Sequence, residues 1–169
     1  MNDIKRIVLT GGPCAGKTTA LVRIIEHFSS LGFKVFTIPE VPTLFTQAGM
    51  NYLTKNQAFF YEGEKATLEI QLALEDKFMG MAQQCTQPSI IVCDRGAMDI
   101  SAYMAPEMWE QLIHAVGTTT PELRERYDAV RFADLTLAVV GEGNDRRGGA
   151  VAFAVGDDDR LAAFHDGNA

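Results

Sequence analysis

The chain has 169 residues, of which 47% are hydrophobic and 22% charged, so it is long enough for one domain with a sizeable core. The net charge of −7 argues against a nucleic-acid-binding protein, which would carry a basic face. The three cysteines show no CxxC spacing, which excludes a disulfide framework or a structural zinc site. No apolar run is long enough for a signal peptide or a membrane span, so we expect a cytoplasmic protein without a transmembrane segment.

Short apolar runs alternate with segments of helical periodicity along most of the chain. The third run, SIIVC, has no polar alternation, as is typical of a strand buried on both faces of a parallel sheet. We therefore predict a three-layer α/β/α fold of the P-loop, kinase-like type with a mainly parallel sheet. The expected strands are 4–10, 33–38 and 89–93, and the expected helices are 17–31, 56–84, 106–115 and 121–126; residues 43–51 give no clear pattern.

The composition changes near Val130. Residues 131–169 contain no lysine and are rich in Gly, Ala and Asp, with 135–140 as one further candidate strand. We predict an NTP-binding domain over 1–130 and a divergent, partly disordered tail over 131–169. Because a core strand is expected at this point, we expect the sheet to be incomplete at its C-terminal end. Our hypothesis is that the tail reflects a change of reading frame or a truncated gene model.

The segment between the first strand and the first helix matches GxxxxGK[ST]. Glycines at its ends allow the main chain to curl around a triphosphate, and the amides at the start of the following helix point at the same oxygens. Lys17 places a positive charge on the β and γ phosphates, and the hydroxyl of Thr18 is a ligand for Mg²⁺. The predicted nucleotide-binding residues are Gly11, Gly12, Pro13, Cys14, Ala15, Gly16, Lys17, Thr18 and Thr19.

A second magnesium ligand is expected at the end of a neighbouring buried strand, and Asp94 follows SIIVC directly. The alternative for Asp94 is an N-cap of the segment after Gly96. No NKxD segment occurs, and Asp94 is followed by Arg95-Gly96-Ala97, so the third strand does not lead into a DxxG segment. This weakens a Ras-like switch but leaves both GTP and ATP as candidate ligands.

Two charged residues are candidates for phosphoryl-transfer chemistry. Arg95 could stabilise the transferred phosphoryl group, and Glu40, after the second strand, could accept the proton of a substrate hydroxyl. The alternatives are an ion pair of Arg95 with Glu40 or Asp99, and a solvated turn for Glu40. The aromatic run 59–61 could line an acceptor pocket or belong to the core.

Several segments together resemble the NadR-like AAA domain of the TRPL translocation defect protein family. They are IVLTGGPCAGKTT, the Ile-Pro-Glu after the second strand, YEGEKATLEIQLALEDKF, VCDRGAMDISAYM and RERYDAV, and they cover about residues 3–130. The resemblance implies a domain similar to the ribosylnicotinamide kinase part of NadR. It also implies that Glu40 and Arg95 match the base and the clamp of the kinase relatives. A lid arginine would follow residue 130 in the family, and Arg146 and Arg147 are the candidates here.

The resemblance further implies GTP binding, phosphoinositide or cytoskeletal partners and a role in membrane-protein trafficking, with a CYTH-like domain following in the relatives. Three possibilities therefore stay open. The first is a nucleotide-dependent trafficking regulator, and the second is a kinase that transfers a γ-phosphoryl group to a nucleoside-type hydroxyl. The third is a truncated, weakly active fragment. The acidic composition offers no polybasic patch for phosphoinositides, so that partner depends on the resemblance alone.

Overall fold

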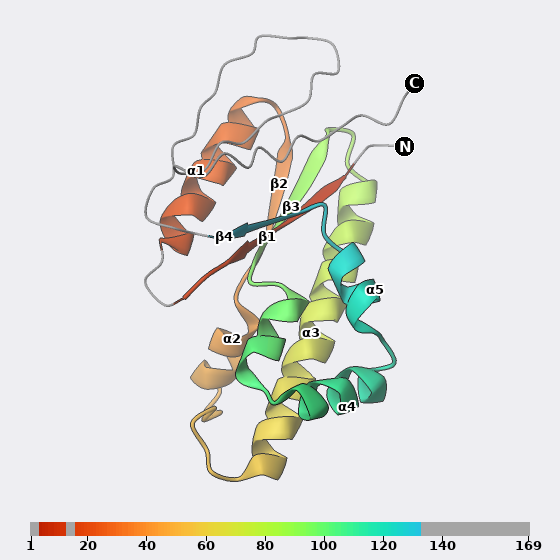
Figure 1. Cartoon of the computed structure of the whole chain (residues 1–169). Helices are drawn as coiled ribbons and strands as arrows, with labels where there is room; N and C mark the ends of the chain where they lie inside the picture. The colour runs from red at the N-terminus through yellow and green to blue at the C-terminus, as the bar shows by residue number, and fades with distance from the viewer. Residues whose placement is uncertain (1–3, 13–15, 133–169) are drawn as a thin grey trace.

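The computed structural model describes residues 4–12 and 16–132. Strands and helices alternate through this part of the chain (Figure 1). In chain order the elements are β1 (Lys5–Thr10), α1 (Lys17–Ser30), β2 (Lys34–Ile38), α2 (Val41–Gln47), α3 (Gln57–Gln83), β3 (Ser89–Asp94), the 3₁₀ helix η1 (Ala97–Tyr103), α4 (Pro106–Val116), α5 (Thr120–Glu125) and β4 (Ala129–Phe132).

The four strands form one sheet in the order β2-β3-β1-β4, and all neighbouring pairs are parallel. β1 pairs with β3 from Lys5 opposite Ile90 to Leu9 opposite Asp94. The chain leaves β1 towards β2 on one side and later returns to β4 on the other side. In open parallel sheets, ligands bind at the carboxyl ends of the strands where the strand order reverses in this way. The ends of β1 and β3 therefore position the site.

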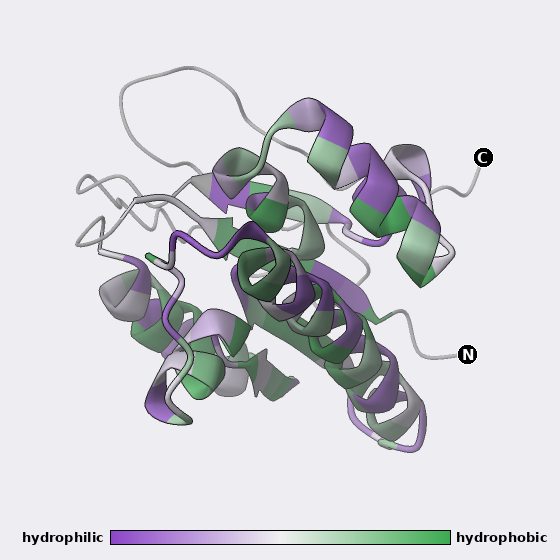
Figure 2. Cartoon of the chain, turned by 90° about the horizontal axis from the view of Figure 1, so that it is seen from below, coloured by the Kyte–Doolittle hydropathy of each residue, from purple (hydrophilic) through white to green (hydrophobic). Residues whose placement is uncertain are grey.

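Helices cover both faces of the sheet, which confirms the predicted three-layer α/β/α fold (Figure 1). On one face Ile7 and Leu9 of β1 pack with Ala20 and Phe28 of α1. On the other face the intervening Val8 packs with a cluster that includes Ala82 of α3. Because both faces are buried, the central residues of the inner strands, 7–9 of β1 and 90–93 of β3, are apolar, while the helices carry hydrophobic and hydrophilic residues together (Figure 2).

The first half of α3 extends beyond the carboxyl ends of the strands and joins α2, η1, α4 and α5 in a helical lobe (Figure 1). This lobe has its own hydrophobic core, made of Leu68, Ala97, Ile100, Trp109, Leu112, Ile113 and Leu123. The lobe brings the α2–α3 segment and η1 to the edge of the sheet where the P-loop lies.

The observed elements follow the sequence prediction closely, and the differences lie next to proline and at the sheet edge. α2 starts at Val41 and extends into the segment without a clear pattern, and Pro42 occupies its first helical turn, a position that does not need a backbone N–H. β4 pairs with β1 and includes Arg131 and Phe132, so the strand continues past position 130. The candidate strand at 135–140 and the candidate lid residues Arg146 and Arg147 lie outside the described residues.

A buried polar network connects the sheet to the helical side. The Glu75 carboxyl of α3 is fully buried and accepts hydrogen bonds from Arg6 (3.1 Å), Arg126 (2.8 Å), Tyr127 (2.6 Å) and Gln71 (2.8 Å). Burial and the nearby charge of Glu75 raise the pKa of Tyr127. The network fixes α3 against β1 and the segment before β4, and so fixes the wall of the pocket described below.

None of the helices among residues 4–12 and 16–132 is long and apolar enough to cross a membrane.

Candidate active site

The phosphate loop begins directly after the buried strand β1. Gly11 has a φ of 135° and Gly16 a φ of 81°, conformations that a side chain would strain and that turn the chain back on itself. The ammonium group of Lys17 lies over this turn and donates hydrogen bonds of 3.0 Å to the carbonyls of Gly11 and of Gly12. Pro13, Cys14 and Ala15 lie outside the described residues.

The N-terminus of α1 faces this loop without a side-chain cap and without an acidic residue in its first turn. The first amides of a helix have no partner within the helix, and they carry the positive end of its dipole. Thr18 and Thr19, in this first turn, are exposed. The predicted residues Gly11, Gly12, Gly16, Lys17, Thr18 and Thr19 thus surround one uncapped helix end, which can bind an anion.

Asp94 ends β3, beside the end of β1, as the sequence predicts. Its Oδ1 atom is buried and has no hydrogen-bond partner among the described residues. Burial and the nearby charge of Glu40 raise the pKa of Asp94, while Lys17 and Arg95 act in the opposite direction. The alternative role as an N-cap is not observed, because Gly96 caps η1 and its N–H donates to Asp99 (2.8 Å).

Arg95 follows Asp94 with a φ of 76°, the one positive φ at a residue other than glycine within the described ranges. A left-handed backbone is strained for a residue with a Cβ, and such positions cluster at functional sites. Its N–H donates to the carbonyl of Leu9 (2.9 Å), which fastens the turn to β1. Its Nε donates to Glu40, so the ion pair expected as one alternative is present. The two terminal nitrogens of Arg95 make no hydrogen bond to a described residue.

Glu40 connects the end of β2 to α2. It accepts hydrogen bonds from Arg95 and from the Thr43 hydroxyl (3.0 Å). Burial alone would raise the pKa of Glu40, but these hydrogen bonds and the charges of Arg95 and Lys17 together hold it below its ordinary value. Glu40 is therefore a carboxylate at neutral pH and is not a freely solvated turn residue.

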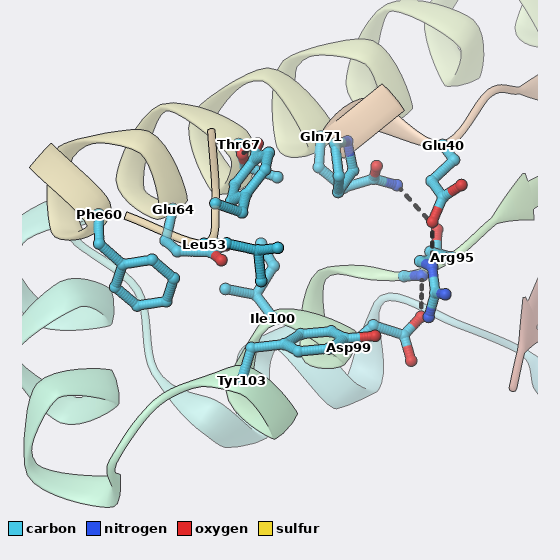
Figure 3. Close-up of a pocket in the computed structure, with 13 residues that line it drawn as sticks. Glu40, Leu53, Phe60, Glu64, Thr67, Gln71, Arg95, Asp99, Ile100 and Tyr103 are labelled. Atoms are coloured by element: carbon cyan, nitrogen blue, oxygen red, sulfur yellow. Dashed lines mark hydrogen bonds and ion pairs between the residues drawn. The ribbon is translucent and has the colours of Figure 1, made fainter. Parts of the chain in front are cut away.

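A pocket of about 370 Å³ begins at this ion pair and extends into the helical lobe (Figure 3). Glu40, Arg95 and Asp99 lie at one end of it, and Phe60 and Glu64 at the other. The complete lining consists of Glu40, Pro42, Tyr52, Leu53, Phe60, Glu64, Thr67, Gln71, Arg95, Gly96, Asp99, Ile100 and Tyr103. This size suits a small organic molecule.

The aromatic run 59–61 at the start of α3 contributes both to the pocket lining and to the hydrophobic core, the two alternatives given for it above. Phe60 lines the pocket, Tyr61 packs against the core of the helical lobe, and Phe59 is 48% exposed. Tyr52, Gln71 and several other pocket residues were not predicted from the sequence. One signal was available, because Glu64, Thr67, Gln71 and Glu75 recur at helical spacing as a polar stripe on the buried side of α3.

A family model described as an AAA domain matches residues 6–150. A search of curated proteins found no match. Among solved structures, a point mutant of the Mycobacterium tuberculosis APS kinase CysC is 11% identical, with 80% of this chain and 78% of that chain covered and a TM-score of 0.41. EHV4-TK complexed with TP4A is 13% identical, with 75% of this chain and 50% of that chain covered and a TM-score of 0.43. The chain thus spans half the length of EHV4-TK.

Proposed function

Because the chain belongs to the AAA domain family and contains a complete P-loop motif, we propose that it binds a nucleoside triphosphate with Mg²⁺ and transfers its γ-phosphoryl group to a small molecule. The observation that carries this proposal is the position of the pocket. Glu40 and Arg95 lie at one end of it, where Arg95 donates to the carbonyl of Leu9 in β1 and the charge of Lys17 acts on Glu40. A phosphoryl donor and a hydroxyl acceptor could therefore be held next to each other.

The residues present fit a magnesium ion. Asp94 offers a buried carboxylate oxygen that has no hydrogen-bond partner in the described part of the chain, and Thr18 offers a hydroxyl at the start of α1. Mg²⁺ is bound in such sites by one or two oxygen ligands from the protein together with phosphate oxygens and water. When bound, the ion would neutralise charge on the β and γ phosphates.

In the proposed reaction a hydroxyl oxygen of the acceptor forms a bond to the γ-phosphorus while the bond between this phosphorus and the β–γ bridging oxygen breaks. The hydroxyl proton passes to the Glu40 carboxylate, and the nucleoside diphosphate leaves. Lys17 and the terminal nitrogens of Arg95 stabilise the negative charge on the transferred group. Because the transition state is loose, little proton transfer is needed early, so a carboxylate with a lowered pKa is an adequate base.

The trafficking function implied by the TRPL resemblance would use the same nucleotide site in another way. Bound GTP or ATP would order loops that contact a phosphoinositide or a cytoskeletal protein, and no acceptor would be phosphorylated. The two functions differ in whether a phosphorylated product forms.

The first experiment measures nucleotide binding by thermal unfolding with ATP or GTP, each with Mg²⁺. A ligand of the native state present at 100 times its dissociation constant adds about 2.7 kcal/mol of stability. We expect this gain in the wild type and its loss in Lys17→Ala. The matched control is Lys77→Ala, which removes an exposed lysine from α3. Equal nucleotide affinity in the wild type and Lys17→Ala would contradict the proposed phosphate site.

The second experiment measures transfer of labelled γ-phosphate to a panel of small alcohols, amino alcohols and nucleosides. Glu40→Gln should lower the turnover by roughly 10²- to 10⁴-fold while nucleotide affinity stays within a few-fold of the wild type. Nucleotide binding without product from any acceptor would contradict the kinase function and leave the regulatory one.

A further inference from the structure

The far end of the pocket contains a carboxyl group that the reaction proposed above does not use. Glu64 projects from α3 into the pocket near Phe60 and Leu53 (Figure 3), and the residue is only 5% exposed. Within the described part of the chain, this carboxyl has no hydrogen-bond or ion-pair partner. Because the carboxyl faces the pocket, a molecule bound there can supply its partner.

The nearby hydrogen-bond donors are already committed to other acceptors. Thr67 donates its single hydroxyl proton to the carbonyl of Gly63 (2.8 Å), so the 2.7 Å contact between the hydroxyls of Tyr52 and Thr67 uses the proton of Tyr52. The two amide protons of Gln71 go to Glu75 (2.8 Å) and to the carbonyl of Arg95 (3.2 Å). A donor for Glu64 must therefore come from water or from a molecule bound in the pocket.

The charges that line the pocket favour a cationic donor. Three carboxylates, those of Glu40, Glu64 and Asp99, face one guanidinium, that of Arg95, which is already paired with Glu40. The Asp99 carboxyl accepts from the hydroxyl of Thr10 and from a backbone N–H, which are neutral donors. The pocket is thus negatively charged, and it would repel an acceptor that carries phosphate or carboxylate groups of its own.

The side chains around Glu64 also suit a cation. Tyr52, Phe60 and Tyr103 line the same pocket. The faces of aromatic rings attract ammonium groups, and an ammonium group between such rings keeps favourable contacts after it loses its water. Burial raises the pKa of Glu64 to about 7, so an adjacent positive charge would stabilise its ionised form.

We propose that Glu64 is a specificity-determining residue and that the acceptor is a hydroxyl compound bearing an ammonium group. The inference rests on the proposed function, since it assigns the pocket to the acceptor. The ammonium group lies at the Phe60 and Glu64 end, and the reacting hydroxyl lies at the end of Glu40 and Arg95.

The test compares two probes of the same shape, choline and its uncharged carbon isostere 3,3-dimethylbutan-1-ol, by titration in an NMR experiment without nucleotide. We expect choline to bind the wild type at least 10-fold more tightly than the isostere. Glu64→Gln should weaken choline at least 10-fold and leave the isostere unchanged. Glu62→Gln, which removes an exposed carboxylate of the same helix, should change neither affinity. Equal affinities for both probes, no binding of either, or an unchanged choline affinity in Glu64→Gln would overturn the inference.

The pH dependence of the wild type provides a second readout that does not need a folded variant. Choline affinity should rise several-fold between pH 6 and pH 8 as Glu64 ionises, and the affinity for the isostere should not. The other titratable groups that face the pocket are Glu40, Tyr52, Arg95, Asp99 and Tyr103, which come from the other elements around it. A choline affinity that does not change with pH would count against Glu64 as its partner.

The inference and the proposed function fail in different ways. Choline binding that depends on Glu64, together with no phosphoryl transfer to any acceptor, would support the ammonium site and refute the kinase function. Phosphoryl transfer to choline and to its uncharged isostere at equal rates, both unchanged in Glu64→Gln, would support the kinase function and refute the ammonium site.

Discussion

Replacing Glu64 with glutamine should make the protein more stable at alkaline pH, although the residue is buried. The carboxyl has no partner among the described residues, and burial raises its pKa from 4.5 to about 7. In the unfolded chain it titrates near its ordinary value. Between pH 4.5 and 7 the native state therefore holds more protons at this position than the unfolded state, and raising the pH lowers the stability of the wild type. Glutamine has the same shape and does not titrate.

The size of the effect follows from the pKa difference. One pKa unit corresponds to about 1.4 kcal/mol, so a carboxyl with this shift costs roughly 3 kcal/mol when it is ionised in the native state. At pH 5 only a small part of this cost is present. The stability of Glu64→Gln minus that of the wild type should thus increase by roughly 2–3 kcal/mol between pH 5 and pH 8. Any packing cost of the buried amide is the same at both pH values, so it cancels from this change.

Urea unfolding of both proteins at several pH values measures this difference. The contributions of all other titrating groups are common to both proteins and cancel. A Glu62→Gln control, on the exposed side of α3, should give a difference that does not vary with pH. Parallel stability curves for the wild type and Glu64→Gln would refute the reasoning, because they would mean that Glu64 titrates equally in the native and unfolded states.

Three further substitutions test other parts of the structure. Glu75→Gln should lower the free energy of unfolding, measured in urea, by about 3–5 kcal/mol, because it leaves two arginines without their buried counter-charge. The control Glu69→Gln, whose side chain is 51% exposed, should change this free energy little. Equal effects of the two substitutions would contradict a stabilising role of the Glu75 network. Gly96→Ala should destabilise by about 1–3 kcal/mol, since its Cβ would lie 2.9 Å from a methyl group of Val8, and a neutral result would show that β1 yields easily. Asp94→Asn should raise the thermal stability of the protein without ligand, because it removes a buried carboxyl whose pKa is raised. It should also abolish the extra stabilisation that Mg²⁺ and nucleotide provide. If Mg²⁺ still stabilised the variant, Asp94 would not be its ligand.

The layer structure could be predicted because it depends on local patterns. A strand buried on both faces must be apolar throughout, and SIIVC shows this without any tertiary information. The helix from Gln57 to Gln83 follows from its periodicity, and its start follows from Asn56, whose side chain accepts from the N–H of Phe59 (3.1 Å). The positions of the P-loop and Asp94 relative to the strands follow from the same patterns.

The pocket could not be predicted in the same way, because segments far apart in sequence form it. The partners of Glu64 and Glu75 depend on what packs against α3, and the periodicity alone gives both residues the same helix face. Glu75 meets two arginines, from β1 and from the segment before β4, whereas Glu64 has no hydrogen-bond or ion-pair partner among the described residues. Two glutamates of one stripe thus have different surroundings, a buried ion-pair network for Glu75 and a pocket for Glu64.

The ionisable groups of the site also show why binding of the two ligands should be coupled. Asp94 lies at the end of β3, where the charge of Lys17 acts on it. Glu40 lies at the nearer end of the pocket and its charge also acts on Asp94, whereas Glu64 lies at the far end of the pocket. A divalent ion at Asp94 would relieve the repulsion between Asp94 and Glu40, and an ammonium group would do the same for the acidic pocket. Each cation therefore compensates charge that the protein alone leaves unbalanced. A phosphoinositide headgroup would add negative charge to this end of the molecule, so a lipid partner would have to bind on a different surface.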